Sequence, residues 1–169
     1  MVYAGGHISG AHYNPAVTLA ALVRGRITLL AAVGYWLIQV VAGLVAAAVV
    51  RIVVGGPRGQ VWSPSGRLLA EALVVEFLFT FALAYVVLNV ATSVDHPNNS
   101  FYGLAIGFTV AAGAIAVGGI SGGVFNPAVL FGGMAMGLFG TSTLLYLVVE
   151  PLGGAAAGLM FRLLNPADS

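Results

Sequence analysis

The stretch GHISGAHYNPAV at residues 6–17 recurs without a gap as GGISGGVFNPAV at residues 118–129. Ile, Ser, Gly, Asn, Pro, Ala and Val coincide in the two copies, and Tyr13 corresponds to Phe125. A match of this length at fixed positions indicates an internal duplication. The fold therefore rests on two related halves, and each half carries one Asn-Pro-Ala tripeptide.

Each Asn-Pro-Ala tripeptide is predicted to begin a short helix. Asn14 and Asn126 suit the N-cap position, because an Asn side chain accepts a hydrogen bond from a first-turn N–H. The Pro that follows fits the first helical position, where a backbone N–H would have no helical partner. The apolar pieces that begin there run over about 15–24 and 127–137. At about 1.5 Å per residue each piece reaches about 15 Å, half the thickness of a bilayer core.

The composition places both halves in a membrane. The 169 residues are 60% hydrophobic and only 7% charged, whereas about a quarter of the residues in a soluble domain are charged. The apolar runs are too long and too continuous for the alternating strands of a membrane β-barrel. We therefore expect an all-α integral membrane protein in a lipid bilayer, with four spans at residues 27–54, 68–92, 101–117 and 141–164.

Several functional classes are disfavoured by the residue inventory. Six basic and five acidic residues give a net charge of +1, which leaves no basic face for nucleic acid. The chain has no Cys, so it offers no thiolate metal site and no cysteine nucleophile. No Ser/His/Asp arrangement, metal-ligand cluster or phosphate-binding loop is evident. We expect neither an enzyme nor a bound metal or cofactor.

The glycine-rich run before each tripeptide predicts non-helical backbone at membrane depth. Such backbone is tolerated only where protein buries it or where it lines a wet cavity. If the two half-helices enter from opposite faces, their N-termini meet near the midplane of the bilayer. Each N-terminus carries about half a positive charge and an Asn amide that points toward the shared path.

Paired Asn-Pro-Ala motifs on duplicated half-helices resemble the major intrinsic proteins, the aquaporin and aquaglyceroporin family. The resemblance implies an inverted-repeat bundle of six spans, of which the first two are expected to be lacking before Met1. It implies a partial first repeat at residues 1–54, an extracytosolic loop at 55–66 and a complete second repeat at 67–169.

The resemblance also assigns roles to single side chains. Gln39 and Glu76 would brace the loops that carry the half-helices, and His12 would face the cytosolic part of the pore. From the residues alone, Gln39 and Glu76 could equally be buried polar groups that a helix neighbour satisfies.

The function that the family implies is a passive channel for water and small neutral solutes that excludes protons and ions. Its narrow centre would be lined by the two tripeptides, Asn14, Pro15, Ala16 and Asn126, Pro127, Ala128. The family assembles as tetramers, so a full-length chain is expected to form a homo-tetramer. The alternative is a non-conducting truncated paralogue or fragment that serves only as a packing partner in the membrane.

Three of the four positions that form the family's selectivity filter can be placed by their spacing from the second tripeptide. They are Ala114, Gly123 and Val129, where water-specific members often carry His at the first and Arg at the third. Small and apolar side chains widen the constriction and remove donors. The filter resembles that of vacuolar-type plant members, and ammonia, hydrogen peroxide, urea or glycerol are candidate solutes.

Two further features are left open by the sequence. Glu150, next to Pro151 in the last span, is either a proton-relay group or a structural carboxylate satisfied by its neighbours. A third Asn-Pro-Ala tripeptide at 165–167 is followed by only two residues, so we expect no helix there.

Overall fold

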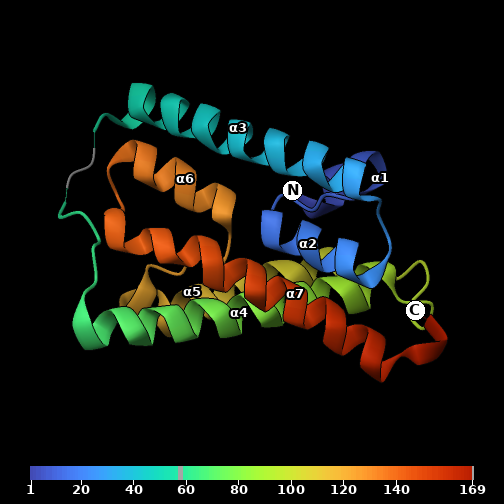
Figure 1. The fold of residues 1–169 in the computed structure, drawn as a ribbon. Helices are drawn as coiled ribbons and strands as arrows, with labels where there is room; N and C mark the ends of the chain where they lie inside the picture. Colours follow the sequence, from blue (N-terminus) through green and yellow to red (C-terminus); the bar gives the residue numbers. More distant parts are fainter. Residues whose placement is uncertain (57–58, 169) are drawn as a thin grey trace.

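The computed structural model describes residues 1–56 and 59–168, and within these residues helices joined by loops make up the fold, without strands apart from an isolated bridge between Trp62 and Phe139 (Figure 1). Two short 3-10 helices, η1 (Thr141–Leu145) and η2 (Pro166–Asp168), accompany the α-helices. The α-helices are α1 (Val2–Ser9), α2 (Pro15–Arg24), α3 (Leu29–Val54), α4 (Gly66–Thr92), α5 (Tyr102–Ser121), α6 (Pro127–Met136) and α7 (Tyr146–Leu164). The predicted all-α class is confirmed.

Four of these segments are long and apolar enough to cross a membrane, which confirms the four predicted spans. Their outer faces are apolar and uncovered: on α3, Leu37 and Ile38 are 66% and 62% exposed. In water such a surface would be a liability, whereas in a bilayer lipid tails cover it. The last span differs slightly from the prediction, because its first turn is η1 and the α-helix begins only at Tyr146.

The two half-helices α2 and α6 lie end to end in the middle of the molecule, with their N-termini facing each other (Figure 1). Helix α3 covers them on one side and α7 on the other, while α4 and α5 lie beyond α7 (Figure 1). The main contact of α3 is with α6 of the second half, and α7 packs extensively on α2 of the first. Each half therefore encloses the half-helix of the other.

Glycines allow these helices to approach closely. A Cβ atom at Gly43 of α3 would lie 2.5 Å from the backbone oxygen of Ala128 in α6. A Cβ at Gly154 of α7 would lie 2.2 Å from the backbone oxygen of Ala16 in α2. Small residues of this kind let helix backbones pack directly against one another in membranes. Helix α3 thus packs closely against α6, and α7 packs closely against α2.

The segments before the tripeptides differ in part from the prediction. The paired glycines at 5–6 and 118–119 are helical, and the helices end only after Ser9 and Ser121. The irregular backbone is confined to the few residues that follow, where Gly10 and Gly122 cap the helices with φ of 72° and 91°. Helical hydrogen bonds inside the membrane outweigh the low helix propensity of glycine, because an unpaired N–H there is costly.

The third tripeptide also departs from the prediction. Residues 166–168 form the 3-10 turn η2, although no helix was expected after Asn165. A single turn needs only one backbone hydrogen bond, and the Asp168 N–H donates it to the Asn165 oxygen at 3.0 Å.

Candidate functional site

The centre of the molecule is built on two identical helix caps. The Asn14 Oδ1 atom accepts a hydrogen bond from the Ala16 N–H at 2.9 Å, and Asn126 Oδ1 accepts one from the Ala128 N–H at 3.0 Å. Both Asn residues have extended backbone, and a Pro occupies the first turn of each helix. These are the contacts expected of N-cap asparagines.

The same two side chains join the half-helices to each other. The Asn14 amide donates to the Phe125 oxygen at 2.7 Å, and the Asn126 amide donates to the Tyr13 oxygen at 2.9 Å. Each acceptor precedes the opposite Asn, so the two bonds form a reciprocal pair between the tips. Because an amide nitrogen carries two hydrogens, each Asn retains one further donor.

The residues whose oxygens accept these bonds have unusual backbone. Tyr13 and Phe125 have φ of 49° and 50°, and Ala11 has φ of 48°. This left-handed conformation costs a residue with a side chain about 1–2 kcal/mol. The cost is offset where distant groups hold the loop, and here the opposite Asn is one of them. Sequence reasoning missed these positions, because it assigned the irregular backbone to the glycines.

The loop that leads into α6 is held by one carboxylate. The Glu76 Oε1 atom accepts from the Ser121 hydroxyl at 2.6 Å and the Val124 N–H at 2.9 Å. Its Oε2 atom accepts from the Phe125 N–H at 2.7 Å. Glu76 lies on α4 and is fully buried, so these donors replace the water that a buried charge requires.

The loop that leads into α2 is held differently. The Gln39 amide of α3 donates to the Thr18 hydroxyl at 2.9 Å, and that hydroxyl donates to the Asn14 oxygen at 3.1 Å. The His12 Nδ1 atom lies 3.1 Å from the same hydroxyl, and its ring stacks on Tyr35 with centroids 4.5 Å apart. A neutral side chain of α3 thus binds α2, and His12 contacts both Thr18 of α2 and Tyr35 of α3.

Two cavities approach the joined tips. A cavity of about 470 Å³ is lined by both Asn14 and Asn126, and another of about 600 Å³ runs along α3 and α6. His12 and Tyr13 line both cavities. The loop that precedes α2 therefore borders both cavities, and Asn14 and Asn126 at the half-helix N-termini line the first of them.

The three predicted filter positions lie in two places. Gly123 has φ of 65°, and a Cβ atom there would lie 3.3 Å from Ala114 Cα, so these two residues are in direct contact. Val129 lies on the first turn of α6, is 50% exposed and lines the larger cavity. The structure thus brings Ala114 and Gly123 together and places Val129 apart from them, on the wall of the larger cavity.

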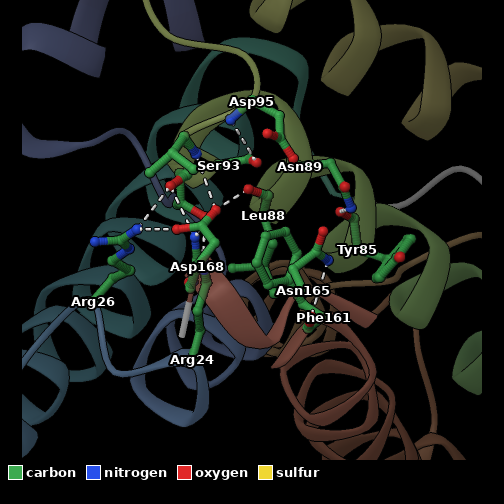
Figure 2. A network of polar contacts seen from close by, with 12 residues as sticks. Arg24, Arg26, Tyr85, Leu88, Asn89, Ser93, Asp95, Phe161, Asn165 and Asp168 are labelled. Atoms are coloured by element: carbon green, nitrogen blue, oxygen red, sulfur yellow. Dashed lines mark hydrogen bonds and ion pairs between the residues drawn. The ribbon is translucent and has the colours of Figure 1, made fainter. Parts of the chain in front are cut away.

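A network at the far end of α2 was not predicted from the sequence (Figure 2). The fully buried Arg24 side chain pairs with Asp168 at 2.9 Å and donates to the Thr92 hydroxyl at 2.6 Å. The Asp168 carboxylate also pairs with Arg26 at 2.6 Å and accepts from the Val94 N–H at 2.9 Å. The hydrogen bond from the Val94 N–H, and to a smaller extent the Arg24 guanidinium, lower the pKa of Asp168 to about 2. The signal in the sequence was an Arg in the last turn of an apolar helix.

Within the described ranges 1–56 and 59–168, no cluster of three or more His, Asp or Glu side chains is placed to hold a metal ion. The polar groups at the joined half-helix tips are the amides of Asn14 and Asn126 and the backbone groups that they bind. Such a centre can orient a small polar molecule by hydrogen bonds, and its two positive helix ends repel cations.

Comparison with known proteins agrees with this geometry. Aquaporin NIP1-4 of Oryza sativa subsp. japonica is 40% identical over 159 residues, which cover 94% of this chain and 58% of that protein. Aquaporin TIP1-1 of Arabidopsis thaliana is 37% identical over 166 residues, covering 95% of this chain and 65% of that protein. The chain spans about three fifths to two thirds of the length of these curated relatives. Residues 1–161 match the family model described as Major intrinsic protein, and the chain belongs to that family.

Proposed function

We propose that the protein provides a passive route for water and small neutral solutes through the membrane and excludes protons and ions. The observation that carries the proposal is the reciprocal pair of hydrogen bonds between Asn14 and Asn126 and the carbonyls that precede them. This pair places two helix N-termini and two spare amide hydrogens beside the same cavity. The relatives named above are called aquaporins, which supports the same conclusion.

The chemistry of the route favours neutral molecules. The free amide hydrogens of Asn14 and Asn126 donate to one permeating oxygen, which turns a water molecule so that it cannot relay a proton to both neighbours. A cation loses hydration that is worth tens of kcal/mol in a low dielectric, whereas a hydrogen bond in the route returns about 1 kcal/mol. The positive N-termini of the two half-helices also repel the cation. Neutral solutes therefore pass and ions do not.

The filter positions favour a broad range of solutes. Ala114, Gly123 and Val129 carry no donor side chain and occupy little space. A constriction with these residues accepts solutes larger than water, such as urea or glycerol, better than one with His and Arg would. Reflection coefficients measured in proteoliposomes test this directly: glycerol should be reflected less than sucrose, and equal reflection of the two contradicts a wide route.

The central test replaces Asn126 with Asp in the purified chain and measures osmotic shrinkage of proteoliposomes by stopped-flow light scattering. Asp keeps the cap acceptor but removes the donor to the Tyr13 oxygen and opposes the positive end of α6. We expect water flux to fall or sodium to enter. The matched control is Asn165→Asp, because Asn165 also donates to a backbone oxygen, that of Phe161 at 3.0 Å, in the third tripeptide.

Two outcomes oppose the proposal. Unchanged flux and unchanged ion exclusion in Asn126→Asp contradict the role of the tips. Absence of flux in the wild type favours a non-conducting packing partner. We further propose that the full-length protein assembles as a homo-tetramer, as the family does, and the mass of the detergent-solubilised full-length protein measured by light scattering tests this.

A further inference from the structure

Glu150 is a buried acidic group that the proposed route does not use. Its side chain on α7 is 0% exposed. Among the residues that the structure describes, none reaches either of its carboxyl oxygens with normal hydrogen-bond geometry. A membrane carboxylate without a donor is costly, so a group of this kind needs a specific explanation.

Three groups face this side chain. The Glu76 carboxyl on α4 and the backbone N–H of Asn126 at the start of α6 are hydrogen-bonding groups beside it, although neither meets normal hydrogen-bond geometry. Tyr146, one turn earlier on α7, is the third. The Tyr146 hydroxyl is already engaged, because it donates to the Ser121 oxygen at 2.8 Å. Glu150 therefore faces the Glu76 carboxylate, which can only accept hydrogen bonds, and the N-terminus of α6.

The two carboxyl groups are supplied with donors very unequally. Glu76 accepts three hydrogen bonds, all at 2.6–2.9 Å, from Ser121, Val124 and Phe125. That set suits an ionised carboxylate, which has acceptors only. A second charge beside it would be opposed both by repulsion and by the lack of solvent. A carboxylic acid in the same place would instead supply a donor, and Glu76 Oε2 has a lone pair left to accept it.

We propose that Glu150 carries a proton and donates it to Glu76, so that the two side chains form an acid–carboxylate pair behind the second half-helix. Glu76 in turn holds the Val124 and Phe125 N–H groups, so Glu150 is a positioning residue for the loop that ends at Asn126. The neutral acid also keeps a negative charge away from the N-terminus of α6. The effect on permeation rests on the proposed function, whereas the location of the proton does not.

Infrared spectroscopy of the purified protein tests the location of the proton. The wild-type-minus-Glu150→Gln difference spectrum should contain the C=O stretching band of a protonated carboxylic acid. The control is Glu71→Gln, because Glu71 is a surface residue that pairs with Arg67 at 2.7 Å and should contribute no such band. If the Glu150 difference spectrum lacks the band, the proposal is wrong.

The partner of the proton is tested by a second variant. Glu76→Gln replaces the carboxylate acceptor by an amide, which is a weaker acceptor. The Glu150 band should therefore shift to higher wavenumber in this variant. A band that stays at its wild-type position would show that Glu150 does not donate to Glu76. A merely structural role for Glu150 predicts no such shift.

Reconstituted vesicles test the positioning role. Glu150→Leu has no donor and should lower water permeability, and Glu150→Gln, which keeps a donor and nearly the same shape, should restore it toward the wild-type value. Equal permeability of the two variants overturns the positioning role. If the wild type itself conducts no water, the proposed function fails, and the infrared band still decides where the proton lies.

Discussion

At the scale of single residues, Glu76 holds most of one loop. Its two oxygens satisfy three donors of one loop, and the loop leads directly into the second half-helix. A buried N–H that loses its acceptor costs about 1–3 kcal/mol. The exposed Glu71, in contrast, takes part only in a surface ion pair with Arg67, which contributes little to stability.

We therefore predict that Glu76→Gln destabilises the protein by about 1–3 kcal/mol, because Gln offers one acceptor oxygen in place of two. Thermal unfolding in detergent, followed by tryptophan fluorescence, measures the change. Glu71→Gln should leave the unfolding temperature almost unaltered. Equal shifts in the two variants would mean that the bonds to the loop contribute no net stability.

The residue scale also shows where sequence reasoning succeeds and where it stops. The caps at Asn14 and Asn126 could be predicted, because the cap depends only on the two residues that follow. The left-handed backbone of Tyr13 and Phe125 could not be predicted. Neither residue prefers that conformation, and each adopts it where its oxygen meets an Asn from the opposite half of the chain.

At the scale of elements, the packing of α7 on α2 depends on Gly154. Replacing Gly154 with Ala would place a Cβ atom 2.2 Å from the Ala16 oxygen, which is too close for any real contact. The two helices must then separate. Overpacking of this kind costs about 1–3 kcal/mol, and it moves α2, which carries Asn14 at its N-terminus.

Gly154→Ala should therefore unfold at a lower denaturant concentration than the wild type and conduct less water. Gly34 of α3 provides the matched control, since a Cβ atom there meets nothing within 4 Å. Gly34→Ala should be neutral or stabilising by up to about 1 kcal/mol through helix propensity. Similar stability of the two variants, measured by titration of mixed micelles with a denaturing detergent, would contradict the close-approach argument.

The helices themselves were largely predictable, because the length of each apolar run fixes the span and the tripeptides fix the start of α2 and α6. Errors occurred where a local preference conflicts with the membrane. The glycines at 118–119 favour irregular backbone in water, yet they lie in α5. Inside a bilayer an open backbone has no water to bond to, so the helix continues to Ser121.

At the scale of the whole molecule, the network around Arg24 ties together parts of the chain that are far apart in sequence. Arg24 and Asp168 are separated by 144 positions, and the Arg24 guanidinium also lies 3.9 Å from the ring centroid of Phe161 on α7 (Figure 2). The network joins the end of α2 to the end of α4 through Thr92. No local pattern predicts such a set, because its members become neighbours only once both halves are packed.

The charge of Asp168 makes this network sensitive to acid. Its pKa is lowered from 3.8 to about 2 in the folded protein. A carboxyl group whose pKa falls on folding stabilises the folded state at pH values above its unfolded pKa, and this contribution disappears as the pH falls through the folded pKa. The stabilisation is thus complete above about pH 4 to 5 and is lost toward about pH 2.

Asp168→Asn lacks this contribution at every pH, so the wild type should unfold at a higher temperature than the variant at about pH 5. The difference should shrink steadily as the pH is lowered toward about 2, where the wild-type carboxyl also becomes neutral. Asp95→Asn, in the neighbouring exposed loop, serves as the control and should follow the wild type. A difference between wild type and Asp168→Asn that does not depend on pH would show that shape and hydrogen bonding, not the carboxylate charge, hold this network together.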